Sequence, residues 1–284
     1  MPLIADPQVT MPTPHPRAVF APSGVITLTT DFGQTDPFVG VMKGQVLRYF
    51  AGARLVDLTH AVTAHQPIEA GFWLGRAYPY FPVGTVHVAV VDPGVGSSRR
   101  IVAVEGDGHL FLAPDNGLLA AVLQRLQAVP VIRYLDPQLL DSLGLDRPSR
   151  TFHGRDIFAP VAAELAAGRL TPDRLGAPGA DPVAGQLAAA RRQHGRVEGV
   201  VVTIDHFGNL LTNIDEQELA GIDHPVVRAC GRELPVLCTY SDAQPGEYLA
   251  LVNSFGVLEI ARSGGSAAAG LGLGRGDTVE VGEA

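Results

Sequence analysis

Carboxylates follow apolar runs at two places early in the chain. Asp31 and Asp36 come after the run 25–30, and Asp92 comes directly after the run 85–91. An ionised carboxylate accepts hydrogen bonds from hydroxyls, pairs with cations and takes up protons. These positions therefore suit ligand binding or acid–base catalysis.

Two further segments contribute cations and an imidazole. Arg99 and Arg100 follow Asp92 in the same loop, and His153 lies in the segment TFHGRD at 151–156. These side chains are further candidates for a polar site at the edge of the sheet. Plain structural roles stand beside this one: a turn former for Asp92, solvated surface charges for the arginines, and a core histidine bonded to backbone for His153.

Structural alternatives also apply to the other polar segments. Asp36 precedes Pro37, a favourable pair for capping and starting a helix. Asp31, in the tripeptide Asp-Phe-Gly, is typical of a turn, and so is the segment 205–209. No single segment decides between a binding role and a structural one.

The sequence lacks the residue patterns that several other kinds of site require. No cluster has zinc-ligand spacing, and no Gly-x-Ser-x-Gly elbow is present. The alternating glycines of 264–276, predicted as a loop, lack the strand and helix that flank a phosphate-binding fingerprint. Cys230 and Cys238 are too few for a disulfide framework, and we predict that both are reduced thiols in the core. The sequence thus predicts neither a metal nor a cofactor.

The elements that must position these residues alternate over the first part of the chain. Strands are predicted at 25–30, 54–58, 85–91, 101–105, 109–113 and 129–134, and helices at 37–50, 68–80, 118–126 and 156–167. This alternation predicts an α/β domain with a mostly parallel sheet and flanking helices. Ligands bind beyond the carboxyl ends of the strands in such sheets, so Asp31, His60 and the loop 92–100 should converge on one edge.

Short strands without intervening helices fill the last part of the chain. They are predicted at 197–204, 211–214, 226–229, 233–238, 248–252, 257–261 and 278–281, and their spacing predicts an all-β, barrel-like C-terminal domain. The predicted organisation is a disordered lead-in at 1–22, an α/β domain at 23–170, a linker rich in Pro, Gly and Ala at 171–195, and the β domain at 196–284.

Composition excludes several kinds of partner. The 284 residues are 46% hydrophobic, and the net charge of -8 without any basic run argues against nucleic acid. No apolar stretch is long enough to predict a membrane span, and the N-terminal segment lacks the pattern of a signal peptide. We expect a cytoplasmic protein whose partner is a small molecule.

Seven segments, in order, resemble one family. They are TTDFGQTDPFVGVMKG, VDLTH, VVDPGVGSSRR, APDNGLL, TFHGRD, IDHFGNLLTNI and NSFGVLEIA. The family is that of the S-adenosyl-L-methionine hydroxide adenosyltransferases, relatives of the fluorinase and chlorinase that make 5′-halo-5′-deoxyadenosine. The resemblance runs from about Val25 to Val281, and it implies a homotrimer with sites at subunit interfaces.

The resemblance also implies a role for each matching residue. Asp31 accepts hydrogen bonds from both ribose hydroxyls. The remaining contacts to S-adenosylmethionine are Asp36 and Asp205 at the methionine amine, Ser254 at the same end, Asn209 at the adenine edge and Phe207 against the adenine ring.

Departures from the halogenase pattern bear on the nucleophile. Where the fluorinase pattern has tyrosine this chain has Asp92, and His153 with Gly154 replaces a Tyr-Ser pair whose hydroxyl bonds fluoride. The long fluorinase insertion before the APNNGLL segment is also absent. Asp92, Arg99 and His153 match the polar triad of the hydroxide-adding branch. A buried carboxylate at the attack site also repels a halide.

These observations predict hydrolysis of S-adenosylmethionine at C5′ to adenosine and L-methionine. Asp92 or His153 takes the proton of the attacking water, and Arg99 stabilises developing negative charge. The sulfonium makes methionine a neutral leaving group, so the reaction requires no metal. The alternatives are a chlorinase-like 5′-halogenase and a non-catalytic S-adenosylmethionine or adenosine-binding protein. His65 stands where halogenases have an aromatic contact, which leaves the shape of the ribose pocket open.

Overall fold

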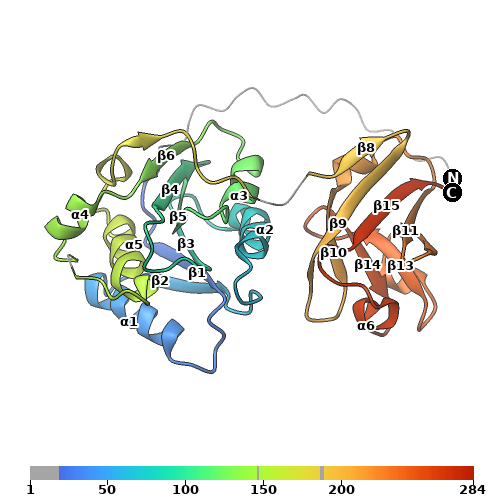
Figure 1. Ribbon diagram of the computed structural model, residues 1–284, viewed down its shortest axis with the longest axis horizontal. Coiled ribbons are helices and arrows are strands. Elements are labelled where there is room, and N and C mark those ends of the chain that lie inside the picture. The colour runs from blue at the N-terminus through green and yellow to red at the C-terminus, as the bar shows by residue number, and fades with distance from the viewer. Residues whose placement is uncertain (1–18, 146, 186–188) are drawn as a thin grey trace. The chain divides into compact units, whose positions relative to one another are not determined.

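The computed structural model describes residues 19–145, 147–185 and 189–284. It divides into two compact units, residues 1–186 and 187–284, which are described separately (Figure 1). Most of the predicted lead-in, residues 1–18, lies outside the described residues. At its end Phe20 is buried in the core of the first unit, and its backbone N–H donates to Glu105 Oε1 at 3.2 Å.

The described part of the first unit centres on a seven-stranded sheet in the order β2-β1-β3-β5-β4-β6-β7. Five strands run in one direction and β4 and β7 run in the other, so the predicted mostly parallel sheet is confirmed. The bounds are β1 (Val25–Thr30), β2 (Arg54–Thr59), β3 (Val86–Val90), β4 (Ile101–Gly106), β5 (His109–Pro114), β6 (Val131–Tyr134) and β7 (Pro178–Gly179).

Helices cover both faces of this sheet (Figure 1). One face packs against α1 (Phe38–Tyr49) and α5 (Ala159–Ala166), and the other packs against α2 (Pro67–Ala77) and α3 (Ala120–Arg125). Because both faces are covered, every residue of β1 is buried, which explains its continuous apolar sequence. No helix among the described residues is long and apolar enough to cross a membrane.

One helix of the first unit is absent from the sequence prediction. It is α4 (Pro137–Ser142), and the Asp136 side chain caps it by accepting a hydrogen bond from the Gln138 backbone N–H. The Asp-Pro pair that starts it is a recognisable signal in the sequence.

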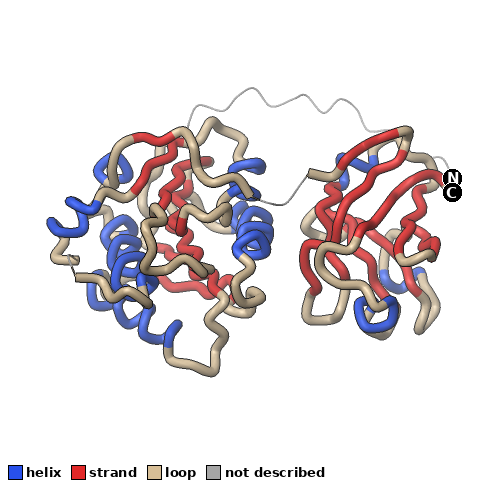
Figure 2. The backbone as a smooth tube through the Cα atoms, in the orientation of Figure 1, coloured by secondary structure: helices blue, strands red, loops and turns tan. Residues whose placement is uncertain are grey.

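Antiparallel strands form nearly all of the second unit, which is barrel-like as predicted (Figure 2). In the described residues their order is β12-β11-β15-β9-β10-β14-β13, with β8 paired to β9. The bounds are β8 (Arg191–Gln193), β9 (Arg196–Ile204), β10 (Leu210–Asp215), β11 (Pro225–Ala229), β12 (Arg232–Pro235), β13 (Tyr248–Val252), β14 (Val257–Arg262) and β15 (Thr278–Glu283).

Two expectations for this unit are wrong. The segment 264–276 is not wholly a loop, because it contains the short helix α6 (Ala267–Leu271), capped by the Ser266 side chain and ended by the left-handed Gly272. Cys230 and Cys238 are free but exposed, not buried in the core. Cys230 has a φ of 45° in the β11–β12 turn, so turn geometry outweighs the usual burial of cysteine.

The range predicted as a linker is paired at both ends. After a short 3₁₀ turn at Pro172–Arg174, β7 pairs with β6 of the first unit, and β8 pairs with β9 of the second. Residues 186–188, between them, lie outside the described residues.

Candidate functional site

Two neighbouring parallel strands carry the predicted carboxylates to one edge of the first sheet. β1 pairs with β3 so that Thr30 lies opposite Val90. Asp31 follows the end of β1, and Asp92 comes two residues after the end of β3. The structure therefore places both loops at the carboxyl ends of the strands, where ligands bind in such sheets.

Asp92, Arg99 and His153 form one hydrogen-bonded cluster. Arg99 Nε donates to both Asp92 carboxylate oxygens at 2.9 Å, and Arg99 Nη2 also bonds Asp92 Oδ2. The same Nη2 lies 2.9 Å from His153 Nδ1. Arg99 thus connects the carboxylate to the imidazole, across 54 residues of sequence.

Close backbone contact brings these loops together. Gly96 has a φ of 78°, and a Cβ there would lie 2.2 Å from the Arg150 carbonyl oxygen. Only glycine allows the loop after β3 to approach the segment before His153 this closely. His153 immediately precedes a π-helical turn, Gly154–Phe158, a rare conformation that often occurs at functional sites.

The cluster is largely screened from solvent. The Asp92 side chain is 5% exposed and that of Arg99 is 11% exposed, so Arg99 is not a solvated surface charge. Burial, together with the Arg99 charge, lowers the pKa of His153 below its usual 6.5, although Asp92 and Asp156 act in the opposite direction. His153 is therefore neutral at pH 7. Since its Nδ1 accepts from Arg99, its hydrogen lies on Nε2.

Arg100 takes a different role from its neighbour. Its Nε donates to Asp115 Oδ2 at 2.9 Å, and its guanidinium stacks 3.7 Å from the Tyr134 ring centroid. It also donates to the Asp181 backbone carbonyl at 2.9 Å. Arg100 therefore fastens the segment after β7 and takes no part in the Asp92 cluster.

Asp31 contacts the residue that departs from the halogenase pattern. Its Oδ2 accepts a hydrogen bond of 2.9 Å from the backbone N–H of His65, which has a φ of 63°. Asp36 is exposed, and it is not the helix cap, because Pro37 occupies the N-cap position of α1. The capping alternative for Asp36 is therefore wrong.

Three aromatic rings connect the Asp31 loop to the His153 loop. Phe32, Phe38 and Phe152 pack edge to face, with centroids 5.5–6.2 Å apart. Phe32 follows Asp31 and Phe152 precedes His153, so this packing fixes the two loops relative to each other.

In the second unit, Asp205 and Asn209 organise their own turn. Asp205 Oδ1 accepts from the backbone N–H groups of Phe207 and Asn209 at 2.9 and 2.8 Å, and Oδ2 accepts from Asn209 Nδ2 at 3.0 Å. Gly208, with a φ of 85°, leaves only 2.1 Å between a built Cβ and Ser266 Oγ. The turn presents Phe207 with 75% of its surface exposed.

A buried carboxylate that sequence reasoning missed supports the Ser254 turn. Glu259 Oε2 accepts from Asn253 Nδ2 at 2.9 Å, and its Oε1 accepts from the Tyr240 hydroxyl at 2.7 Å. Asn253 Oδ1 in turn accepts from the Phe255 backbone N–H, which fixes the turn that exposes Ser254. The signal was an acidic residue inside the apolar run VLEIA.

Electrostatics connects Glu259 to the Asp205 turn. Burial raises the pKa of Glu259, and the negative charge of Asp205 raises it further, against the hydrogen bonds from Tyr240 and Asn253. The first unit thus brings together Asp92, Arg99 and His153 and places Asp31 on the neighbouring loop. Within the second unit, Asp205, Phe207 and Asn209 share one turn, and Ser254 lies on a separate turn.

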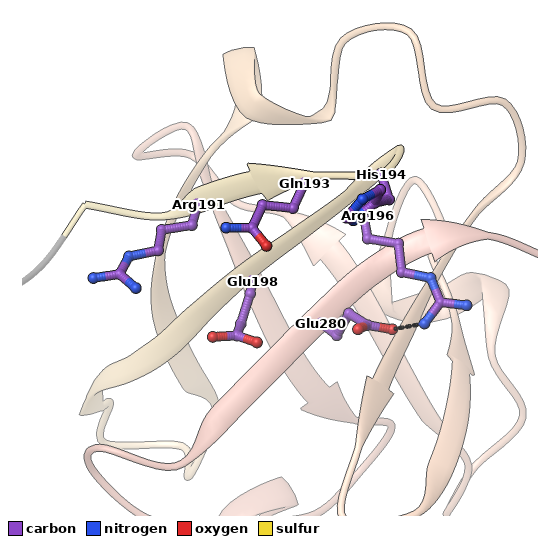
Figure 3. A pocket seen from close by; sticks show the side chains of 6 residues that line it. All are labelled: Arg191, Gln193, His194, Arg196, Glu198 and Glu280. Atoms are coloured by element: carbon purple, nitrogen blue, oxygen red, sulfur yellow. Dashed lines mark hydrogen bonds and ion pairs between the residues drawn. The ribbon is translucent and has the colours of Figure 1, made fainter.

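One solvent-facing hollow of the second unit is separate from the predicted residues. It has a volume of about 480 Å³ over β8, β9 and β15, with the Arg196–Glu280 ion pair at its margin (Figure 3). Its lining side chains include none of the predicted site residues, and we assign it no ligand. No group of three or more His, Cys, Asp or Glu side chains in the described ranges could hold a metal ion.

The fold and the cluster together define the class of protein: an α/β unit with an Asp–Arg–His cluster beyond its strand ends, followed by a barrel-like β unit. The chain belongs to the S-adenosylmethionine (SAM) hydroxide adenosyltransferase family. The family's N-terminal domain model matches residues 26–176, and its C-terminal domain model matches residues 199–280.

Individual relatives span nearly the whole chain. An (R)-S-adenosyl-L-methionine hydrolase of Salinispora tropica is 38% identical over 264 residues, covering 92% of this chain and 98% of the relative. The hydrolase of the same name from Thermus thermophilus is 38% identical, covering 89% and 97%. A fluorinase of Actinoplanes sp. is 29% identical, covering 90% and 97%. The resemblance predicted from the seven segments is confirmed.

A solved structure supports the same fold. The crystal structure of an uncharacterized conserved protein from Thermotoga maritima superposes with a TM-score of 0.83 at 35% identity, covering 91% of this chain and 100% of that one.

Proposed function

We propose that this protein hydrolyses S-adenosylmethionine at C5′, giving adenosine and L-methionine. The observation that carries the proposal is the Asp92–Arg99–His153 cluster, three polar groups preassembled by hydrogen bonds, with Asp92 and Arg99 largely screened from solvent. The hydrolase relatives, 38% identical over most of the chain, support water as the nucleophile over the halide used by the more distant fluorinase.

The geometry supports Asp92 as the base. The His153 Nδ1 lone pair already accepts from Arg99, and the Nε2–H interacts with the Ser149 backbone, so His153 has no free lone pair to take the proton of the water. Free hydroxide at pH 7 would cost about 12 kcal/mol from a water pKa of 15.7. Transfer of the proton to Asp92 as the water attacks avoids that cost.

The electron balance needs nothing further. The water oxygen forms a bond to C5′, the C5′–S bond breaks, and its electron pair stays on sulfur as the neutral thioether of methionine. Asp92 holds the released proton before passing it to solvent, and Arg99 offsets the negative charge that develops on the water oxygen. Alignment of the water with the C5′–S bond lowers the barrier further.

The substrate's other groups are assigned to loop and turn residues outside the Asp92 cluster. Asp31 binds the ribose hydroxyls. Asp36 and Asp205 bind the amine of the methionine part, and Ser254 binds the methionine end as well. Asn209 and Phe207 bind the adenine. The exposure of Phe207 supports this assignment, because an aromatic side chain with 75% of its surface free offers a ring for stacking.

A labelled-water experiment tests the reaction directly. The reaction is run in H₂¹⁸O with both sulfonium epimers of S-adenosylmethionine. The 5′-hydroxyl of the product adenosine should carry ¹⁸O. We expect turnover to persist in the presence of a chelator and to yield no 5′-chloro-5′-deoxyadenosine when chloride is added. 5′-Chloro-5′-deoxyadenosine as the main product would favour the halogenase, and no product at all would favour a binding protein.

We further propose a homotrimer. Three apolar side chains of the first unit support an interface: Val41 and Leu47 on α1 and Val56 on the edge strand β2 are each about 40% exposed. Sedimentation should give three subunits for the parent and fewer for Val56→Glu. A monomeric parent would contradict the proposal.

We also place the protein in the cytoplasm. The two free, exposed thiols support this location, because reducing compartments keep such thiols unpaired. Cell fractionation tests it.

A further inference from the structure

A buried histidine lies beside the loop that carries Asp31. His60 follows β2 and is 2% exposed. Its Nδ1 lies 2.8 Å from the hydroxyl of Thr30, the last residue of β1, and its Nε2 lies 3.0 Å from Asp57 Oδ1. Lys43, from α1, bonds the other oxygen of Asp57 at 2.5 Å. A polar chain therefore runs from α1 through β2 to the end of β1.

The positions of the hydrogens show which atom donates in each contact between Thr30 and His60. The Thr30 hydroxyl oxygen accepts from the Phe32 backbone N–H at 3.2 Å, which leaves its own hydrogen to donate to His60 Nδ1. The His60 hydrogen then lies on Nε2, which is close to the Asp57 carboxylate but lacks the alignment of a hydrogen bond. Although burial acts to raise it, the pKa of Asp57 is lowered because Lys43 and His60 both interact with its charged form.

The backbone of His60 holds the other side of the same loop. Its carbonyl oxygen accepts from the Gly33 N–H at 2.8 Å. His60 is therefore hydrogen-bonded on both sides of Asp31. Its side chain bonds Thr30, which precedes Asp31, and its backbone carbonyl bonds Gly33, which follows it. A third attachment joins the same two loops, because Asp31 itself accepts from the His65 N–H.

We propose that His60 is a positioning residue for ribose recognition: it fixes the end of β1 so that the Asp31 carboxylate faces the two ribose hydroxyls. The inference rests on the proposed function, since it takes ribose as the ligand of Asp31. His60 itself touches no substrate. Its contribution is to restrict the orientations of Asp31, and preorganisation of this kind is realised as binding affinity.

Discrimination between adenosine and 2′-deoxyadenosine isolates this role from mere stability. A hydrogen bond from a hydroxyl to a carboxylate is worth about 1.5–3 kcal/mol, so the parent should bind adenosine about 10–100-fold more tightly. Asp31→Ala should bring the ratio of the two Kd values close to one. His60→Leu should reduce the ratio at least about fivefold, while His60→Asn, whose amide can still bond Thr30, should keep most of it.

Two further variants keep the test decisive. Thr30→Val removes the same hydrogen bond without touching His60 and should lower the ratio in the same way. His194→Asn, at an exposed turn of the second unit, should leave it unchanged. A parental ratio in folded His60→Leu and Thr30→Val would overturn the inference alone. A ratio near one in the parent, or a parental ratio in Asp31→Ala, would overturn the ribose role of Asp31 and the inference with it.

Discussion

The candidate residues of the two units are held in different ways. In the first unit, Asp92, Arg99 and His153 come from distant segments, and their side chains bond one another. In the second, Asp205 bonds the backbone of its own turn, and Phe207 and Ser254 extend from turns as exposed side chains. Groups that act on one reacting atom need fixed mutual geometry, whereas groups that recognise the ends of a ligand need only well-formed turns. The Asp92 cluster of the first unit should therefore control chemistry, and the turns of the second unit should affect binding alone.

The largest expected effect breaks the cluster of the first unit. Asp92→Ala, Arg99→Ala and His153→Ala should each lower turnover by ~10²–10⁴, the usual contribution of a positioned acid–base group. Because the three groups act on one water, double variants should lose much less than the product of the single losses. Single-turnover measurements, with the enzyme in excess over S-adenosylmethionine and at a saturating concentration, give the rates of the chemical step.

A neighbouring arginine supplies the matched control. Arg100→Ala removes the same side chain one residue away, but Arg100 bonds Asp115 instead of Asp92, so turnover should stay within a few-fold of the parent. Multiplicative losses in the double variants would mean that the triad does not act as a unit. Near-parental turnover in all three single variants would contradict the hydrolytic mechanism.

The next effect separates two carboxylates of the same loop. Asp31→Ala should weaken adenosine binding by ~10–100-fold, the usual cost of losing a hydrogen bond to a charged group. Asp36→Ala should leave adenosine binding unchanged and raise the KM for S-adenosylmethionine, because its proposed partner is the methionine amine. Titration calorimetry with adenosine distinguishes the two, and equal losses in both variants would remove the assignment.

A smaller effect is expected at the support of the Ser254 turn. Glu259→Gln removes the charge that orders Asn253 and Tyr240, so the KM should rise by about tenfold or less while turnover at saturation stays close to the parent. Glu233→Gln, on the exposed face of β12, is the control. A fall in turnover at unchanged KM would contradict the division between chemistry and binding.

The smallest effect is a difference in pH response. His87, in the first unit, bonds Thr27 and His109, and burial together with His109 holds its pKa well below 6.5. Below pH 6.5, His87 is therefore protonated in the unfolded protein but stays neutral in the folded protein. His87 alone should lower the free energy of unfolding of this unit by up to about 1.4 kcal/mol per pH unit as the pH drops below 6.5, and His109, whose pKa is also lowered by burial, adds to that slope.

Glu259 acts in the opposite direction in the second unit. Its raised pKa means that the folded form takes up a proton before the unfolded form does, so this group adds stability as the pH falls toward 4.5. Denaturant unfolding at pH 7.5 and 5.5 measures the slope, which His87→Val should reduce. An unchanged slope in that variant would show that His87 is not its source.

The positions of the strand ends could be predicted from the sequence, but the contacts between distant segments could not. Asp31 and Asp92 were predictable at one edge because parallel strands bring their carboxyl ends together. The bond between Arg99 and His153 joins loops 54 residues apart, and no local pattern encodes it; only the family resemblance suggested the triad. Glu259 was missed because its environment depends on Asn253 and Tyr240, which lie on other segments.

Average residue preferences failed where backbone geometry decided. Cysteine is usually buried, yet Cys230 lies in a turn with positive φ and is exposed. The segment 264–276 is rich in glycine, yet Ser266 supplies a cap and the alanines after it form α6. Both outcomes depend on one or two positions that a compositional average does not weigh.

The placement of the thiols gives the chain built-in spectroscopic labels. Cys230 and Cys238, the chain's two cysteines, are exposed in the second unit, while its single tryptophan, Trp73, lies on α2 of the first. A thiol-reactive dye that accepts energy from indole would attach to the second unit alone. Energy transfer from Trp73 would then report the separation of the two units in solution, before and after S-adenosylmethionine binds, with no residue of the proposed site replaced.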